Sequence, residues 1–195
     1  MSAASSALID DHQDVVSSHD RFPSVRFQGV DWDLSHLNPF ALRVDIGEGL
    51  LVDVVVLFSC HCFTHGAYRD PRVPIPGAER YWDGRDARVL NAERYHLSKQ
   101  FLPQLIHELT DRHIMVEDAS RPTFVTMEVT DSFGKVVHYA VFFEVRKDKR
   151  RQKRLLLRVQ SAYPIEHLNK RQQKARKVRF VVLLRAAYTG KPIKG

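Results

Sequence analysis

Four segments of alternating apolar residues in the C-terminal part of the chain constrain the fold most strongly. In each segment apolar side chains recur at every second position, which is typical of a β-strand with one buried face. Short polar connections separate the first three segments, and strands joined in this way pair antiparallel. The pattern predicts a four-stranded antiparallel meander, formed by TFVTMEV (123–129), VVHYAVFFEV (136–145), RLLLRVQSAY (154–163) and VRFVVLL (178–184).

A helix is predicted before this meander. Asn91 is a suitable N-cap, and an apolar stripe follows at helical spacing, formed by Leu97, Phe101, Leu105 and Leu109. Pro103 lacks an N–H group, so we expect it to kink the helix or split it, with Ser98 capping the second piece. We therefore expect an α+β fold. Its antiparallel sheet, a four-stranded C-terminal meander plus an N-terminal β extension, would pack on one Pro-interrupted helix.

The first 20 residues differ in composition from the rest of the chain. They are small, polar and acidic, which predicts a disordered N-terminal tail (residues 1–20) before a single α+β domain (residues 21–195). No apolar run approaches the roughly 20 residues needed to span a bilayer, so no membrane partner is expected. The two cysteines, only two positions apart, form no disulfide framework, and we expect a reducing, cytoplasmic location.

The segment FSCHCFTH (58–65) holds both cysteines and two of the ten histidines. It continues a β-branched run, so we expect it to be the end of a strand from residue 50. Alternation then places Cys60 and Cys62 on an apolar face, and His61 and His65 on the other. Ligands on opposite faces cannot meet at one ion, and no metal site or cysteine nucleophile is expected here. The alternative is a turn near residue 63 that folds His65 back.

Charge is distributed unevenly along the chain. Residues 145–195 contain 17 Lys and Arg against two acidic residues, a net charge of +15, whereas residues 1–144 contain 13 basic and 21 acidic residues, a net charge of −8. This asymmetry favours a polyanion partner, RNA above all, although a solvated basic face is the alternative. Two basic runs flank one predicted strand and can lie together. The predicted nucleic-acid-binding residues are Arg146, Lys147, Lys149, Arg150, Arg151, Lys153, Arg154, Lys170, Arg171, Lys174, Arg176, Lys177 and Arg179.

The predicted sheet has one apolar face and one mixed face. Alternation assigns Tyr163 to the apolar face. To the mixed face it assigns His138, Glu144, Arg158, Gln160 and Arg179.

A helix followed by such a meander, together with the segment LLLRVQSAYP (155–164), resembles the RelE-type toxins and the wider barnase/EndoU/colicin-like ribonuclease group over residues 91–188. The resemblance implies metal-independent RNA cleavage without a cofactor. It makes His138 or Glu144 the base, Arg158 the phosphate clamp and Tyr163 a proton donor. Gln160 or Ser161 would orient the phosphate.

The functional expectation is therefore an RNA-directed protein, in the form of a toxin-type endoribonuclease with an acidic, antitoxin-like protein partner. Two alternatives use the same basic surface. One is a non-catalytic nucleic-acid-binding or ribosome-associated module, and the other is a subunit whose basic face binds an acidic protein.

Overall fold

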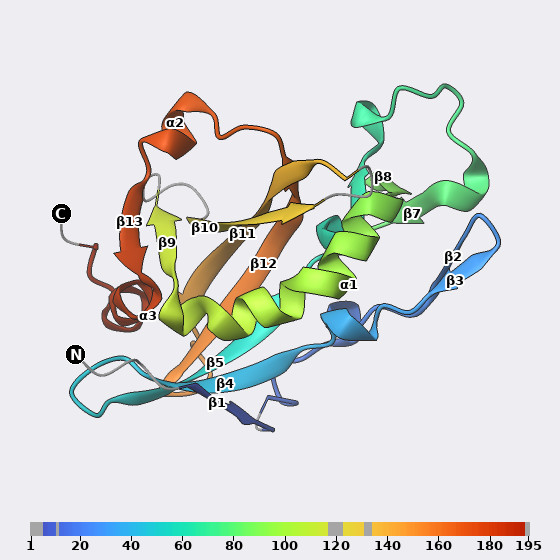
Figure 1. Cartoon of the computed structure of the whole chain (residues 1–195). Helices are drawn as coiled ribbons and strands as arrows, with labels where there is room; N and C mark the ends of the chain where they lie inside the picture. The colour runs from blue at the N-terminus through green and yellow to red at the C-terminus, as the bar shows by residue number, and fades with distance from the viewer. Residues whose placement is uncertain (1–5, 11, 117–122, 131–133, 194–195) are drawn as a thin grey trace.

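An eight-stranded sheet organises the chain, and two helices share a hydrophobic core with it (Figure 1). The computed structural model describes residues 6–10, 12–116, 123–130 and 134–193. The strand order in the sheet is β1-β4-β5-β12-β11-β10-β9-β13. Its strands are β1 (Ser6–Ile9), β4 (Phe40–Asp45), β5 (Leu51–Phe58), β9 (His113–Val116), β10 (Thr123–Thr130), β11 (Val136–Lys147), β12 (Arg154–Ile165) and β13 (Arg176–Arg179).

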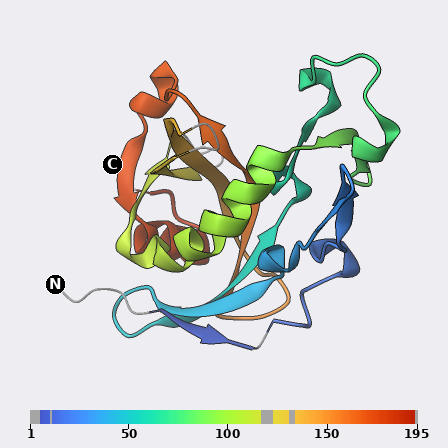
Figure 2. The same ribbon diagram turned by 45° about the vertical axis from the view of Figure 1, so that its right-hand side comes forward.

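Two smaller sheets lie beyond the start of the first helix, and Figure 2 shows them apart from the large sheet. They are the hairpin of β2 (Val25–Phe27) and β3 (Val30–Trp32), and the set β6 (Thr64–Gly66), β8 (Ala87–Leu90) and β7 (Arg80–Trp82). The helices are α1 (Ala92–His107), α2 (Lys170–Gln173) and α3 (Phe180–Thr189). Short 3-10 turns are formed by Ser18–Asp20, Ser35–Leu37, Cys60–Cys62, Ala67–Arg69, Gly77–Glu79 and Glu108–Asp111. No helix in the described part of the chain is long and apolar enough to cross a membrane.

The α+β class is confirmed, but the sheet is larger than expected and mixed. β10, β11 and β12 form the predicted antiparallel meander. However, β12 pairs in parallel with β5, which comes from the N-terminal half of the chain. Seven of the eight residues of β5 are buried, as is usual for a central strand covered on both faces.

Part of the segment 1–20, for which we expected disorder, covers the second face of β5. β1 pairs antiparallel with β4 at the sheet edge. A small second core lies here, formed by Ala41, Val55 and Leu57 with Ile9, Val15, Val16 and Leu156 packed against it. The N-terminal segment therefore contributes both a strand and apolar side chains to the fold.

The helix α1 begins where the sequence predicted but is not split. The Asn91 side chain accepts a hydrogen bond from the Arg94 backbone N–H at 2.9 Å, so the N-cap is confirmed. α1 continues through Pro103 to His107 as one helix. The prediction that Ser98 caps a second piece is wrong, because Ser98 is buried and its hydroxyl donates to the Tyr95 carbonyl instead. Leu102, Leu105 and Ile106 are fully buried in the main core, so tertiary packing compensates for the proline.

The last predicted strand, 178–184, is wrong over most of its length. β13 ends at Arg179, and Phe180 begins α3. Phe180 and Leu184 are buried in α3 whereas Val182 between them is exposed, and this pattern fits a helix, because a strand would place all three on one face. The Phe180 ring lies 6.2 Å from that of Phe143, which packs α3 on β11. Short apolar runs are compatible with either element, so packing decided this one.

Candidate functional site

The turn between β11 and β12 together with the last two residues of β11, residues 146–153, carries five of the ten exposed basic residues predicted to bind nucleic acid. We call it the basic hairpin loop. Its basic residues are exposed except Arg151, which is half-buried. The loop lines a hollow of about 750 Å³. Its one acidic residue, Asp148, is 5% exposed and turns inward to Arg154, so its charge does not neutralise the outer surface.

Arg154, one of the predicted nucleic-acid-binding residues, is fully buried. Its guanidinium donates to Asp148 at 2.7 Å and to both carboxylate oxygens of Asp14 at 2.6 and 2.8 Å. The hydrogen bonds that Arg154 donates to Asp14 and Asp148 raise the pKa of Arg154 further above its usual range. The Arg154 side chain therefore forms an internal ion pair that holds the N-terminal segment to β12, and the guanidinium is not accessible to a phosphate.

The second basic segment, residues 170–179, begins at α2, beyond the opposite end of β12 from the basic hairpin loop, and runs back through β13 toward α3. The hairpin loop precedes β12 in the chain and α2 follows it, and Figure 1 shows α2 beyond the end of β12. The 12 residues of β12, about 35 Å of strand, lie between the basic hairpin loop and the connection to α2. Exposed residues here are Lys170, Arg171, Lys174, Lys177 and Arg179, whereas Arg176 is half-buried and donates to the Ile193 carbonyl. The expectation that the two runs lie together is not met.

The five residues predicted to be catalytic do not converge on one point. Glu144 and Arg158 lie directly opposite each other on β11 and β12. His138 lies six residues from Glu144 along β11, which is about 20 Å. Glu144 forms an ion pair with Arg146 at 2.8 Å, and Arg158 forms one with Asp20 at 3.0 Å. Although burial opposes it, hydrogen bonds from Ser17 and Arg158 lower the pKa of Asp20.

A β-bulge changes the faces of β12. Phe142 pairs with Ser161 and Phe143 with Val159, which leaves Gln160 as the extra residue. Every side chain after the bulge changes face relative to simple alternation, so the assignment of Tyr163 to the apolar face is wrong. The Tyr163 ring stacks on Phe142 at 5.4 Å, and the Arg94 guanidinium lies 4.5 Å from the Tyr163 ring centre. Tyr163 is thus held by packing, and it lies opposite Ala140, four residues along β11 from Glu144.

A cluster that sequence reasoning dismissed lies after β5. The strand ends at Phe58, and residues 60–62 form a 3-10 turn, so the alternation assumed across FSCHCFTH is wrong. Ser59 caps this turn, its hydroxyl accepting from the His61 N–H at 3.2 Å. The turn brings donor atoms of Cys60, His61 and Asp83 within 4.8 Å of one another. The signal available in the sequence was Ser59 itself, because serine is a frequent cap.

These three residues line a cavity of about 610 Å³, which also contacts Asp20, Tyr81 and Arg158. Asp83 comes from the turn between β7 and β8, which pair antiparallel. Burial raises the pKa of the Cys60 thiol to about 11. Burial and the nearby Arg88 lower the pKa of His61, so its imidazole is neutral at neutral pH. In this protonation state Cys60 is a poor nucleophile, and His61 has a free ring nitrogen.

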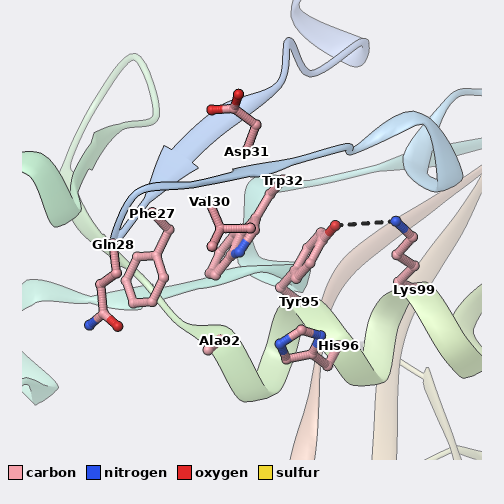
Figure 3. Close-up of a pocket in the computed structure, with 9 residues that line it drawn as sticks. All are labelled: Phe27, Gln28, Val30, Asp31, Trp32, Ala92, Tyr95, His96 and Lys99. Atoms are coloured by element: carbon pink, nitrogen blue, oxygen red, sulfur yellow. Dashed lines mark hydrogen bonds between the residues drawn. The ribbon is translucent and has the colours of Figure 1, made fainter.

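A second cavity, of about 460 Å³, lies between the β2–β3 hairpin and α1 (Figure 3). Its aromatic side chains pack on one another: the Trp32 and Tyr95 rings are parallel at 4.3 Å, and Phe27 lies 4.5 Å from Trp32. Lys99 donates to the Tyr95 hydroxyl at 3.3 Å. Trp32 is only 3% exposed, so the rings mainly attach the hairpin to α1.

Comparison with known proteins identifies the family. The model of the YjaZ family matches residues 24–188, which is most of the chain. A relative, Protein YjaZ of Escherichia coli (strain K12), is 28% identical over 128 residues, covering 66% of this chain and 66% of the relative. The aligned region spans slightly less than two thirds of that relative. No solved structure matches the chain. The resemblance to RelE-type toxins and barnase-like ribonucleases is therefore wrong, and the chain belongs to the YjaZ family.

Proposed function

We propose that this protein binds RNA through the basic hairpin loop without cleaving it. The observation that carries the proposal is the inward orientation of Asp148. The loop has six basic residues, and its one carboxylate, that of Asp148, forms an ion pair with the buried Arg154. A loop with this charge on a rigid pair of long strands supports phosphate contacts, whose affinity arises largely from counterion release.

Binding is favoured over cleavage by the arrangement of the mixed face. Metal-independent cleavage requires a base, an acid and a cation around one phosphate. Glu144 already pairs with Arg146, Arg158 pairs with Asp20, and His138 lies about 20 Å along the strand from Glu144. An endoribonuclease would have to rearrange all three, whereas a binding module needs no such change.

RNA is favoured over an acidic protein by an aromatic side chain beside the loop. The Lys147 ammonium lies 4.8 Å from the ring centre of Tyr188, at the end of α3. Aromatic rings next to cations are a common platform for single-stranded nucleic acids, because bases stack on the ring while cations hold the phosphates. The proposal includes a cytoplasmic location, where RNA is abundant. An acidic protein partner is the competing outcome.

The test is fluorescence anisotropy with a single-stranded RNA between 50 and 200 mM salt. If all six loop cations contact phosphates, the slope of log affinity against log salt is about −4. The variant Lys149→Glu with Arg150→Glu should reduce the steepness of this slope by about 1.4 and weaken binding. Arg26→Glu with Arg69→Glu is the matched control. It makes the same change in net charge on exposed side chains elsewhere and should leave the slope unchanged.

Equal loss of binding in both variants would contradict a specific role for the loop. The same reactions, run on a gel with and without EDTA, report the integrity of the RNA. Fragments that persist in EDTA would favour the endoribonuclease instead. If the protein does not bind RNA but binds an acidic protein at high salt, the acidic-protein alternative is favoured.

A further inference from the structure

The cluster of Cys60, His61 and Asp83 offers three different metal-ligand atoms at one place. A thiol sulfur, an imidazole nitrogen and a carboxylate oxygen all lie within 4.8 Å of one another. Cys60 is 7% exposed, whereas the His61 side chain is 39% and the Asp83 side chain 13% exposed. An ion can therefore reach the cluster from the cavity, and the Cys60 sulfur is the most deeply buried of the three ligand atoms.

The spacing within the cluster fits ligands of a common ion better than direct hydrogen bonds. His61 Nε2 and Asp83 Oδ2 are 3.7 Å apart, beyond the usual hydrogen-bond range. Two such atoms bound to one zinc ion, at about 2.0–2.2 Å each and a tetrahedral angle, lie about 3.4 Å apart. The existing pair needs to move by only a few tenths of an ångström to fit, and the most distant pair by about 1 Å.

Supporting hydrogen bonds already orient the Asp83 carboxylate and fix the turn that carries Cys60 and His61. Asp83 Oδ1 accepts from the backbone N–H groups of Arg85 and Asp86 at 2.9 and 2.7 Å, which fixes the carboxylate while Oδ2 faces His61. The Ser59 hydroxyl accepts from the His61 N–H and donates to the Gln160 carbonyl at 2.7 Å, which ties the turn to β12. Contacts of this kind behind the ligands are a regular feature of metal sites.

Arg88 is the competing positive charge at the cluster. Its Nη1 lies 3.9 Å from Asp83 Oδ2, too far for a hydrogen bond, while its Nε donates to Thr64 Oγ1 at 2.7 Å. A thiolate and a carboxylate together carry two negative charges, which balance a divalent ion. Arg88 then remains as an outer charge held by Thr64, and Oδ2 is accessible to an ion.

We propose that Cys60, His61 and Asp83 bind a zinc ion, with the fourth coordination position open to the 610 Å³ cavity. A mixed sulfur, nitrogen and oxygen set suits zinc more than magnesium or calcium, which prefer oxygen alone. Structural zinc sites have four protein ligands. A site with three protein ligands and an open fourth position is instead one in which the fourth ligand can exchange, as in catalytic zinc sites. Arg158, which lines the same cavity, would face a ligand bound at the open position. This site is separate from the basic hairpin loop, and its test does not depend on RNA binding.

The test is titration of the metal-free, full-length protein with Co²⁺, a spectroscopic substitute for zinc. We expect one Co²⁺ per chain, a thiolate-to-cobalt charge-transfer band and intense tetrahedral bands, all displaced by Zn²⁺. Cys60→Ser should abolish the charge-transfer band. His61→Gln and Asp83→Asn should each weaken binding at least about tenfold. Cys62→Ala and His65→Gln are matched controls, because Cys62 is buried outside the cluster and His65 contacts Asp70; both should keep the spectrum.

Two results would overturn the proposal. The absence of a charge-transfer band, or an equal band in Cys60→Ser, would show that the cluster does not bind the metal. Azide should shift the tetrahedral bands if the fourth position is open. An unchanged spectrum on addition of azide would contradict an exchangeable site. The His61 and Asp83 variants keep the test valid if Cys60→Ser fails to fold, because both of these side chains lie partly at the surface.

Discussion

Replacing Arg154 by methionine tests whether the buried ion pair holds the N-terminal segment to the sheet. The change removes the guanidinium but keeps a similar volume, so little cavity is created. Asp148, whose side chain is 4% exposed, would be left without its charged partner, and Asp14 would lose its two hydrogen bonds to the guanidinium. The perturbation therefore isolates charge pairing from packing.

The magnitude follows from the burial of the pair. Breaking a buried ion pair by removing one partner costs about 3–5 kcal/mol, because a carboxylate remains desolvated. Asp14 adds little to this cost, because its side chain is 55% exposed and largely screened by solvent. For a chain of this length each kcal/mol corresponds to about 2–4 °C in Tm, so we expect a decrease of roughly 10 °C.

The assay is urea unfolding followed by circular dichroism, with Arg158→Met as the matched control. Arg158 also pairs with an N-terminal carboxylate, Asp20, but the Arg158 side chain is 43% exposed and Asp20 keeps its hydrogen bonds from Ser17, so the loss of Arg158 should cost less than about 1 kcal/mol. Combining Arg154→Met with Asp148→Asn should recover part of the stability, since the stranded charge is removed. Equal, small losses in the two arginine variants would refute the reasoning.

Three further predictions concern single residues in the fold. Burial lowers the pKa of His36 to about 4. The unfolded chain, with its pKa near 6.5, therefore binds the proton first, and the free energy of unfolding should fall by about 1–2 kcal/mol between about pH 6.5 and 4, after allowance for partial exposure. His36→Asn should flatten that pH profile, and parallel profiles would contradict this. The buried Tyr139 hydroxyl has no hydrogen-bond partner among the described residues, so Tyr139→Phe should raise the stability to urea by about 1 kcal/mol. A decrease would show that the hydroxyl is satisfied. Gly190 ends α3 at φ +70°, so Gly190→Ala should lower Tm by roughly 2–4 °C, whereas Gly77→Ala, at ordinary φ and with equal space, should not.

The sequence predicted elements whose signals are local. The meander strands β10, β11 and β12 follow from alternation, and Asn91 identified the start of α1. Prediction from the sequence failed where two local signals compete. The run from Phe180 is compatible with strand or helix, and only its packing on Phe143 selected the helix. The same holds at Ser59, where a cap ended the strand pattern that we extended to His65.

The candidate site shows a related division. The basic composition of residues 146–153 is visible in the sequence, but the burial of Arg154 depends on Asp14, 140 positions away. The cluster of Cys60, His61 and Asp83 could not be found from spacing, because it joins two turns that are 20 or more residues apart. Sequence proximity grouped Cys60 and His61 with Cys62 and His65, which lie outside the cluster, and on that basis we expected no metal site.

By itself, the sequence determined the α+β class, the order of the meander, the start of α1 and the charge asymmetry, because side-chain period and charge act over a few residues. Only the tertiary structure decided the parallel pairing of β5 with β12, the bulge at Gln160 and which charges are buried. These features depend on contacts between distant segments. The free energy of such contacts comes from burial and pairing across the sheet, and no local pattern records which segments will meet.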